Sequence, residues 1–284
     1  MGEQAANANP EIGRTIDAGG ISTNYHDRGA GDPVILIHGS GPGVSAWANW
    51  RLNIPYLERG LRVIAPDMVG FGSSERPAGV RYDQALWVRH LIDFMDALGI
   101  AKAHVVGNSF GGGMALALAT QAPERVGRMV LMGSVGIRFP LTEGLDAAWG
   151  YTPSIANMRR LLGMFAFNKA LVGDDLAELR YRASIRPGFQ ESFASMFPAP
   201  RQQGIDDLAI DEAAIAALEN PTLILHGRED QVIPFSNSLR LFELLRNAEL
   251  HGFRNCGHWT QIEHADRFNL LVGDFLGRSG GERP

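Results

Sequence analysis

The stretch Gly-Asn-Ser-Phe-Gly-Gly at residues 107–112 limits the possible fold more than any other feature of this chain. The short, partly β-branched run at residues 103–106 before it predicts a buried strand, and the small and straight-chain residues 112–119 after it predict a helix. A Gly-x-Ser-x-Gly pattern between a strand and a helix is typical of a turn too tight for flanking side chains. Such a turn lifts the serine oxygen clear of the sheet. We therefore predict that Ser109 is a nucleophile rather than a structural turn residue.

A serine nucleophile needs a base, and the base needs an acid that orients it. Asp230 lies in a polar turn that directly follows an apolar run, where an acid at the end of a strand is expected. His258 follows a later segment of alternating polarity. The chain order Ser, Asp, His is that of the α/β-hydrolase fold. We predict a triad of Ser109, Asp230 and His258, with Glu229 as the alternative acid.

We interpret each of the other histidines as structural or solvent-exposed, and the single cysteine as structural. His38 opens a glycine-rich loop, which predicts that it hydrogen-bonds this loop into shape. Cys256 lies near His258 but lacks an elbow of its own, so we expect a packing residue. No Cys/His cluster has metal-ligand spacing, and we expect no metal. The remaining histidines are His26, His90, His104, His226, His251 and His264.

Acyl-transfer chemistry requires two N–H donors at the developing oxyanion. The N–H of Phe110, at the start of the predicted helix, is directed at the space above the Ser109 oxygen. The second donor is expected from the loop His-Gly-Ser-Gly-Pro-Gly at residues 38–43, whose glycines allow close approach of the backbone. We choose the N–H of Ser40, with Gly41 as the next candidate. The triad and these donors suffice, so we expect no cofactor.

Strands and helices alternate in the first part of the chain, which predicts an α/β core. The expected elements are strands at 21–28, 33–38, 61–67, 103–106, 127–132, 221–227 and 248–253, and helices at 47–57, 83–98 and 112–119. The sheet is expected to be mostly parallel and flanked by helices, because the run at 33–38 is continuously apolar.

Residues from about 135 to 209 interrupt this rhythm with helical patches and almost no strand pattern. We predict a core of residues 1–134 and 213–284 with a helical cap at 135–212. An insertion directly after a core strand usually covers the active site, so we expect some of its aromatic and methionine side chains to line the substrate pocket and others to pack in a small core of the cap. These are Phe139, Trp149, Met158, Met164, Phe165, Phe167, Phe189, Phe193, Met196 and Phe197.

Bulk properties exclude several classes of function. The net charge of −5 without a basic block argues against a nucleic-acid-binding protein. No apolar run approaches the ~20 residues that span a membrane, and the N-terminus lacks an apolar signal core. One cysteine fits a reducing compartment. We expect a cytoplasmic protein that forms a homo-oligomer, taken to be a dimer because closed symmetric assemblies are common.

Several motifs together resemble the meta-cleavage-product hydrolases. They are the loop at 38–43 with Trp47 and Asn49, the segments 66–68 and 70–72, the serine motif at 107–112, Gly257-His258-Trp259, and the cap segment 180–189. The likeness extends from about Glu11 to Phe275 and is closest to the branch acting on 2-hydroxymuconic semialdehyde and related alkyl dienoates. It implies a hydrolase that cleaves a C–C bond in 2-hydroxy-6-oxohexa-2,4-dienoates, small-molecule products of aromatic ring fission.

The resemblance also implies which residues bind the substrate. Arg180 would pair with the substrate carboxylate, although its spacing alone is that of a surface arginine; Arg182 and Arg186 are neighbouring alternatives. The polar end of the pocket would be lined by Gly41, Asn49, Asn108 and Trp259. The rival hypotheses are a carboxylesterase of the same fold and a ligand-sensing relative with slow turnover. A haloalkane dehalogenase is disfavoured because position 109 holds serine rather than a carboxylate.

Overall fold

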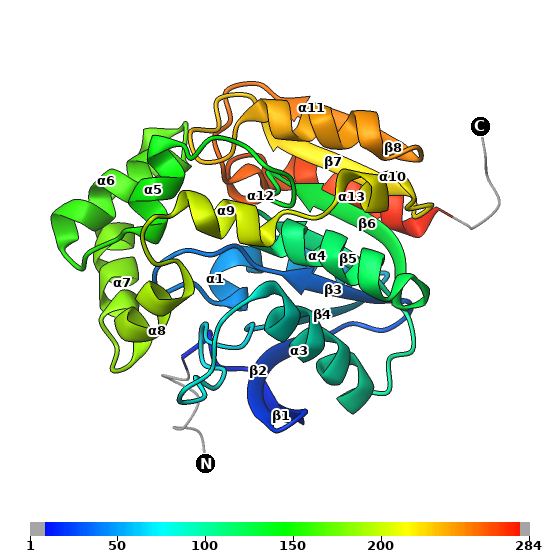
Figure 1. Ribbon diagram of the computed structural model, residues 1–284, viewed down its shortest axis with the longest axis horizontal. Coiled ribbons are helices and arrows are strands. Elements are labelled where there is room, and N and C mark those ends of the chain that lie inside the picture. Colours follow the sequence, from blue (N-terminus) through cyan, green and yellow to red (C-terminus); the bar gives the residue numbers. More distant parts are fainter. Residues whose placement is uncertain (1–8, 279–284) are drawn as a thin grey trace, which may run out of the picture.

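A computed structural model describes residues 9–278 and contains one twisted, eight-stranded sheet (Figure 1). The strand order is β1-β2-β4-β3-β5-β6-β7-β8. The pairs β1/β2 and β2/β4 are antiparallel, and the other neighbours are parallel, which confirms the predicted mostly parallel sheet. The strands span Arg14–Ala18 (β1), Ile21–Arg28 (β2), Pro33–Ile37 (β3), Arg62–Pro66 (β4), Ala103–Asn108 (β5), Val126–Met132 (β6), Thr222–Gly227 (β7) and Ala248–Phe253 (β8).

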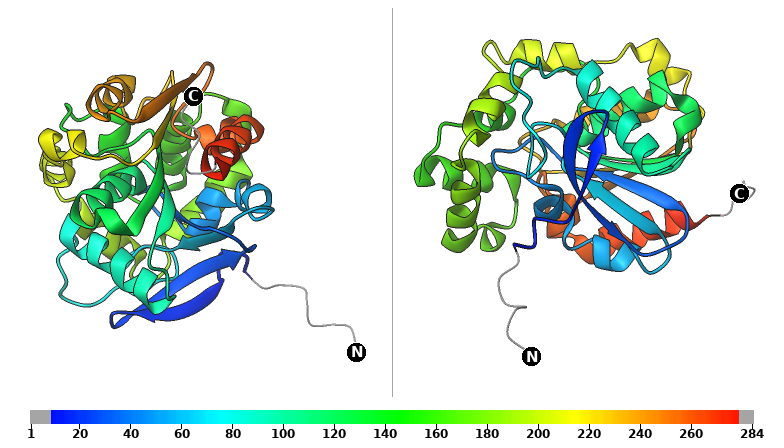
Figure 2. Two further views of the ribbon diagram at one scale, coloured as in Figure 1. Left: turned by 90° about the vertical axis from the view of Figure 1, so that its right-hand side faces the viewer. Right: turned by 90° about the horizontal axis from the view of Figure 1, so that it is seen from below.

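Two helical layers cover the sheet because its central strands are apolar on both faces (Figure 2). Along β3, Ile35 and Ile37 belong to one hydrophobic cluster, and Val34 and Leu36 belong to the other. The first cluster includes side chains of α3 (Gln84–Ala97), α4 (Phe110–Gln121), α10 (Glu212–Ala216) and α11 (Phe235–Leu244). The second includes side chains of α1 (Ala46–Trp50), α2 (Ile54–Leu57) and α13 (Ala265–Gly277), which α12 (Thr260–Glu263) precedes.

A group of helices between β6 and β7 lies beside the carboxyl ends of the parallel strands, on the left in Figure 1. They are α5 (Glu143–Trp149), α6 (Ile155–Phe165), α7 (Asp174–Ser184), α8 (Phe189–Met196) and α9 (Gln202–Leu208). Short 3₁₀ turns occur at Pro123–Arg125 and Lys169–Leu171. We refer to α5–α9 as the cap helices. Their buried side chains belong to the larger hydrophobic cluster of the core, so cap and core share one continuous apolar interior.

Two local expectations were wrong. The single helix expected at 47–57 is divided into α1 and α2, because the Asn53 side chain donates to Gln261 O (3.2 Å) and Asn269 Oδ1 (2.8 Å), and Pro55 follows at the start of α2. The hairpin strand β1 was not predicted, because its polar, largely exposed sequence gives no strand pattern.

Candidate active site

Ser109 stands in the strained turn between β5 and α4. Its backbone has φ = 55° and ψ = −112°, and of the non-glycine residues in 9–278 only it and Asn255 have positive φ. A Cβ at Gly107 would lie 2.3 Å from the carbonyl oxygen of Gly111, and one at Gly111 would lie 2.2 Å from that of Ile37. The predicted reason for glycine at both positions is therefore confirmed. The turn leaves the Ser109 side chain at the wall of a cavity.

Asp230 and His258 meet although 27 residues separate them along the chain. Asp230 lies in the turn after β7, and its Oδ2 accepts a 2.7 Å hydrogen bond from His258 Nδ1. Its Oδ1 accepts from the N–H groups of Val232 (2.7 Å) and Ile233 (3.0 Å). Burial alone would raise the pKa of Asp230, but the charge of His258 and the hydrogen bonds outweigh burial and hold that pKa well below its ordinary value.

The backbone of His258 is held by the cap, since its N–H donates to Phe165 O at 2.7 Å. Glu229, the alternative acid, instead accepts the N–H of Cys256 at 2.9 Å. Burial and, after it, nearby carboxylates raise the pKa of the Cys256 thiol, so this cysteine stays protonated at neutral pH and packs as expected.

The loop at residues 38–43 is shaped by the buried His38. The Nδ1–H of His38 donates to Gly39 O (2.8 Å), and its Nε2 accepts the N–H of Met68 (3.0 Å). Burial lowers the pKa of His38 to about 4, so the ring is neutral at pH 7 and can accept this bond. The expected structural role of His38 is therefore confirmed.

Two of the three candidate oxyanion donors line the cavity, and the third, Phe110, directly follows Ser109 of its wall. Ser40 and Gly41 line it, and the Ser40 hydroxyl accepts from Trp149 Nε1 of the cap at 3.0 Å. The Phe110 ring packs in an aromatic cluster, with its centroid 4.7 Å from that of Trp87. Phe110 can therefore contribute to the site only through its main-chain N–H. Within residues 9–278, the N–H groups of Ser40 and Phe110 donate to no protein acceptor.

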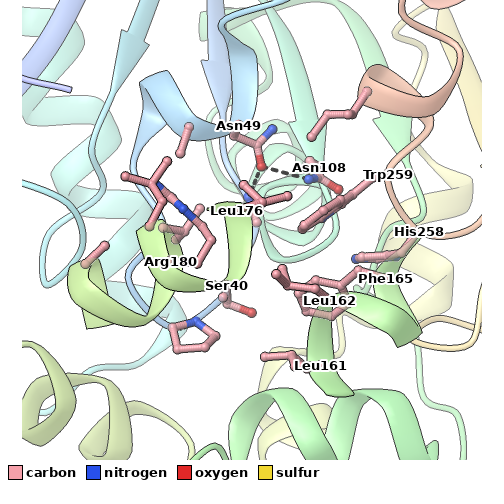
Figure 3. A pocket seen from close by; sticks show the side chains of 18 of the residues that line it. Ser40, Asn49, Asn108, Leu161, Leu162, Phe165, Leu176, Arg180, His258 and Trp259 are labelled. Carbon is pink, nitrogen blue, oxygen red and sulfur yellow. Dashed lines mark hydrogen bonds between the residues drawn. The ribbon is translucent and has the colours of Figure 1, made fainter. Parts of the chain in front are cut away.

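The cavity has a volume of about 520 Å³ and lies between the core and the cap helices (Figure 3). Its apolar wall is mostly aliphatic, and Met158 and Phe165 are the members of the aromatic and methionine set that line it. Trp149, Phe193 and Phe197 pack together instead, with Trp149 and Phe197 stacked at 4.3 Å. The lining residues of the apolar wall include Leu145, Leu161, Leu162, Leu171, Leu176, Leu179 and Val232.

A polar corner faces this apolar wall. Asn49 Oδ1 accepts from Asn108 Nδ2 (2.9 Å) and from the N–H of Gly39 (3.3 Å). Asn49 Nδ2 and Asn108 Oδ1 have no partner in the described part of the chain, which leaves one donor and one acceptor. Trp259 also lines the cavity, with its ring 5.3 Å from that of Phe165.

Arg180 lines the same corner and is paired with a carboxylate of the protein itself. Its Nη2 donates to Glu11 Oε1 at 2.6 Å, and its Nη1 donates to Gly43 O at 3.3 Å, while Nε has no partner within residues 9–278. Arg186 also approaches Glu11 (3.5 Å) and lines the cavity. Arg182 is exposed and pairs with Glu178, away from the cavity.

Sequence reasoning missed two residues of this region. Glu11 precedes the first strand and carries no motif, so nothing in the sequence indicated that it lies 8% exposed beside Arg180. His226 was interpreted as structural, yet its Nε2 lies 3.0 Å from Asp230 Oδ2. Its spacing of four residues from Asp230, across the turn after a buried strand, is a signal that could have identified it.

Two classes of feature are absent from residues 9–278. No three His, Cys, Asp or Glu side chains cluster as metal ligands would. No helix in that range has the length and apolarity required to cross a bilayer.

Comparison with known proteins places these features in a family. The model of the alpha/beta hydrolase fold matches residues 32–265. The chain is 66% identical over 267 residues to a 2-hydroxymuconate semialdehyde hydrolase of Pseudomonas sp. (strain CF600), covering 94% of each chain. It is 58% identical to a 2-hydroxy-6-oxo-2,4-heptadienoate hydrolase of Pseudomonas putida, covering 95% of this chain and 98% of the relative. Among solved structures, a serine-to-alanine variant of a meta-cleavage product hydrolase from Pseudomonas fluorescens, complexed with acetates, has a TM-score of 0.94 and 64% identity, covering 94% of this chain and 98% of that one.

Proposed function

The chain belongs to the alpha/beta hydrolase fold family and, within it, to the meta-cleavage-product hydrolases, and on that premise we propose how its residues hydrolyse a C–C bond of 2-hydroxy-6-oxo-2,4-dienoates. The substrates are of the 2-hydroxymuconic semialdehyde type. Addition of one water to each yields 2-hydroxypenta-2,4-dienoate and a small carboxylic acid. The proposed role of each residue is inferred from the geometry of the site and from the resemblance of the motifs.

One observation carries the assignment: a single cavity has Ser109 and His258 in its wall and a cationic corner on another side. Figure 3 shows Arg180 on one side of the cavity, His258 on the opposite side, and Asn49 and Asn108 between them. An extended dienoate has its carboxylate at C1 and its carbonyl at C6. Arg180 would bind the carboxylate through Nε–H and its Nη groups, and Asn49, Asn108 and Trp259 would surround the C2 oxygen. The C6 carbonyl would then lie over Ser109.

His258 would transfer protons in both steps of the reaction. Asp230 fixes the proton on Nδ1, which leaves Nε2 as the base. In the first step, the 2-hydroxyl loses its proton and C5 gains one, so that the dienol becomes a 2-ketone. The ketone is needed because C–C cleavage releases an electron pair at C5, and only a conjugated carbonyl can accept it.

In the second step, either Ser109 or a water activated by His258 adds to C6. The oxyanion formed would accept hydrogen bonds from the N–H groups of Ser40 and Phe110. The C5–C6 bond then breaks, and its electron pair passes through the conjugated chain to the C2 oxygen, which gains a proton. An acyl-enzyme route and a gem-diol route use the same groups, and both end with the carboxylic acid from C6.

Replacing Arg180 by glutamine tests the proposed substrate orientation. A charge-assisted hydrogen bond contributes about 1.5–3 kcal/mol, so we expect KM for a dienoate to rise about 10- to 150-fold. Hydrolysis of a neutral ester should change little. Arg182→Gln is the matched control, because Arg182 lies on the same helix and pairs outside the cavity. Equal effects of Arg180→Gln on dienoate and ester would favour a carboxylesterase.

An assay of turnover tests the other rival hypothesis, the ligand-sensing relative. Rapid loss of the yellow dienoate absorbance with purified protein would exclude a ligand-sensing relative with slow turnover, and absence of turnover of any dienoate or ester would support it. We also propose that small C6 substituents are preferred, which a panel from hydrogen through methyl to phenyl tests. Loss of preference across that panel would contradict this proposal.

We further propose that the enzyme is cytoplasmic and homo-oligomeric, with a dimer as the expected assembly. Light scattering of the purified protein measures the assembly directly, and a monomeric mass at micromolar concentration would contradict it. Fractionation of the producing cells locates the protein, and recovery outside the cytoplasmic fraction would contradict that placement.

A further inference from the structure

A second histidine reaches the carboxylate of the proposed triad. His226, at the end of β7, places Nε2 3.0 Å from Asp230 Oδ2, the same oxygen that accepts from His258 Nδ1 at 2.7 Å. Oδ1 is already occupied by two backbone N–H groups. Four donors therefore surround this carboxylate, and two of them are imidazoles that share one oxygen.

The surroundings of His226 determine where its proton lies. Its Nε2 faces two acceptors, Asp230 Oδ2 and Ile233 O (3.1 Å), so Nε2 must carry a hydrogen. Its Nδ1 lies 2.7 Å from the hydroxyl of Ser238 in α11, which can donate to it. A neutral His226 thus donates to Asp230 on one side and accepts from Ser238 on the other.

This arrangement is sealed from solvent. The side chains of His226, Ser238 and Asp230 are fully buried, and the His226 ring packs against Phe235 with centroids 5.3 Å apart. Hydrogen bonds to a charged oxygen are strong where water is excluded. His226 also lies outside the lining of the cavity, so it does not touch substrate in the proposed binding mode.

We propose that His226 is a positioning residue for the triad: by sharing Asp230 Oδ2 with His258, it holds the carboxylate in place and limits how firmly His258 retains its proton. This inference rests on the proposed triad. If the Nε2–H of His226 is removed, Oδ2 loses one of its two donors and becomes a stronger acceptor for His258. His258 then becomes harder to deprotonate, and a base is active only when deprotonated.

We expect the other titratable groups near His226 and Asp230 to keep their contacts when the His226 donor is removed. Glu229, in the turn after β7, binds the N–H of Cys256, and Glu263 of α12 binds the N–H of Gly257 at 2.7 Å. The Cys256 thiol is protonated, because burial raises its pKa. A change in the pH profile therefore reports the loss of the His226 donor.

The experiment compares His226→Leu with His226→Gln. We expect His226→Leu to move the acid limb of the kcat/KM profile to higher pH by about 0.5–1 unit, the usual scale for one neighbouring group. Its plateau should fall about 3- to 10-fold. His226→Gln retains an N–H donor and should restore most of the wild-type profile. The matched control is His251→Gln, on the neighbouring strand β8, where the ring is half-buried and contacts Phe253.

Ser238→Ala keeps the proposal testable if His226→Leu does not fold. It removes only the hydroxyl that polarises His226, and should move the acid limb in the same direction by a smaller amount. Proton NMR gives a readout independent of turnover: the low-field resonance of the His258 Nδ1–H should shift in His226→Leu and Ser238→Ala, and stay near its wild-type position in His251→Gln.

Two failures are distinguishable. If Ser109→Ala or Asp230→Asn retains wild-type turnover, the triad itself is wrong. If both lose activity, but His226→Leu and Ser238→Ala only lower the free energy of unfolding and leave the acid limb and the resonance unchanged, His226 is merely structural and this inference is overturned.

Discussion

Replacing Gly133 by alanine tests whether the geometry of the Asp230–His258 pair depends on the absence of a side chain at position 133. Gly133 follows β6 with φ = +48°, and a Cβ there would lie 3.2 Å from Asp230 Oδ2 and 3.3 Å from His258 Nδ1. Both contacts are shorter than ordinary packing distances, so the two side chains must shift by a few tenths of an ångström. The substitution is therefore expected to lower stability through the left-handed backbone and to lower activity through the displaced side chains.

Each effect has a magnitude. A left-handed alanine costs about 1–2 kcal/mol, which corresponds to a decrease in Tm of about 2–3 °C for a chain of this size. A displacement of 1 Å in a catalytic group can cost about 100-fold, so a few tenths should lower kcat about 3- to 10-fold.

The matched control is Gly99→Ala. Gly99 also has a positive φ (+66°), but its added Cβ would meet no heavy atom within 4 Å. Denaturant unfolding and steady-state dienoate hydrolysis are measured for both variants at the same temperature. We expect similar losses of unfolding free energy and a loss of kcat in Gly133→Ala alone. Equal kcat in the two variants would refute the reasoning.

Three further outcomes test the site and its surroundings. Ser109→Ala and His258→Ala should each lower kcat on the order of 10³-fold or more, with the double variant no worse than either, as steady-state kinetics will measure; near-wild-type hydrolysis by Ser109→Ala would exclude it as the nucleophile. Asp230→Ala should cost less, because water can partly orient the imidazole, so a loss exceeding that of His258→Ala would contradict its orienting role. Burial lowers the pKa of His90 to about 4 from 6.5, so its contribution to stability is full above pH 6.5 and is lost as the pH falls towards 4. In denaturant titrations, His90→Gln should therefore reduce the loss of stability across that range, by up to about 1.4 kcal/mol per pH unit; an unchanged slope would contradict this.

The elbow could be predicted from the sequence because its demands are local. Gly107 and Gly111 are required by contacts between neighbouring stretches of one strand–turn–helix unit, so the pattern around Ser109 indicates both the structure and the exposed hydroxyl. The same holds for the strands, whose apolar runs directly reflect burial on both faces. Asp230 and His258 were identified by their positions after such strands, and the structure brings them together.

The lining of the cavity could not be predicted in this way. Some aromatic and methionine side chains were expected there, and Met158 and Phe165 line the cavity, but Trp149 and Phe197 stack on each other instead and most of the apolar wall is aliphatic. The sequence indicates that these residues are buried, but not against which partner. Burial is a property of one side chain, whereas a lining depends on how several helices pack.

The sequence by itself therefore determined the fold class and the elbow around Ser109, and it led to the proposed nucleophile and the order of its proposed partners, because periodicity and tight turns are encoded within a few neighbouring residues. Only the tertiary structure placed Glu11 against Arg180 and His226 against Asp230. Residues 11 and 180 lie 169 positions apart, and no local pattern specifies such an ion pair. His226 is near Asp230 in sequence, but its orientation depends on Ser238, which α11 brings to the other side of the ring.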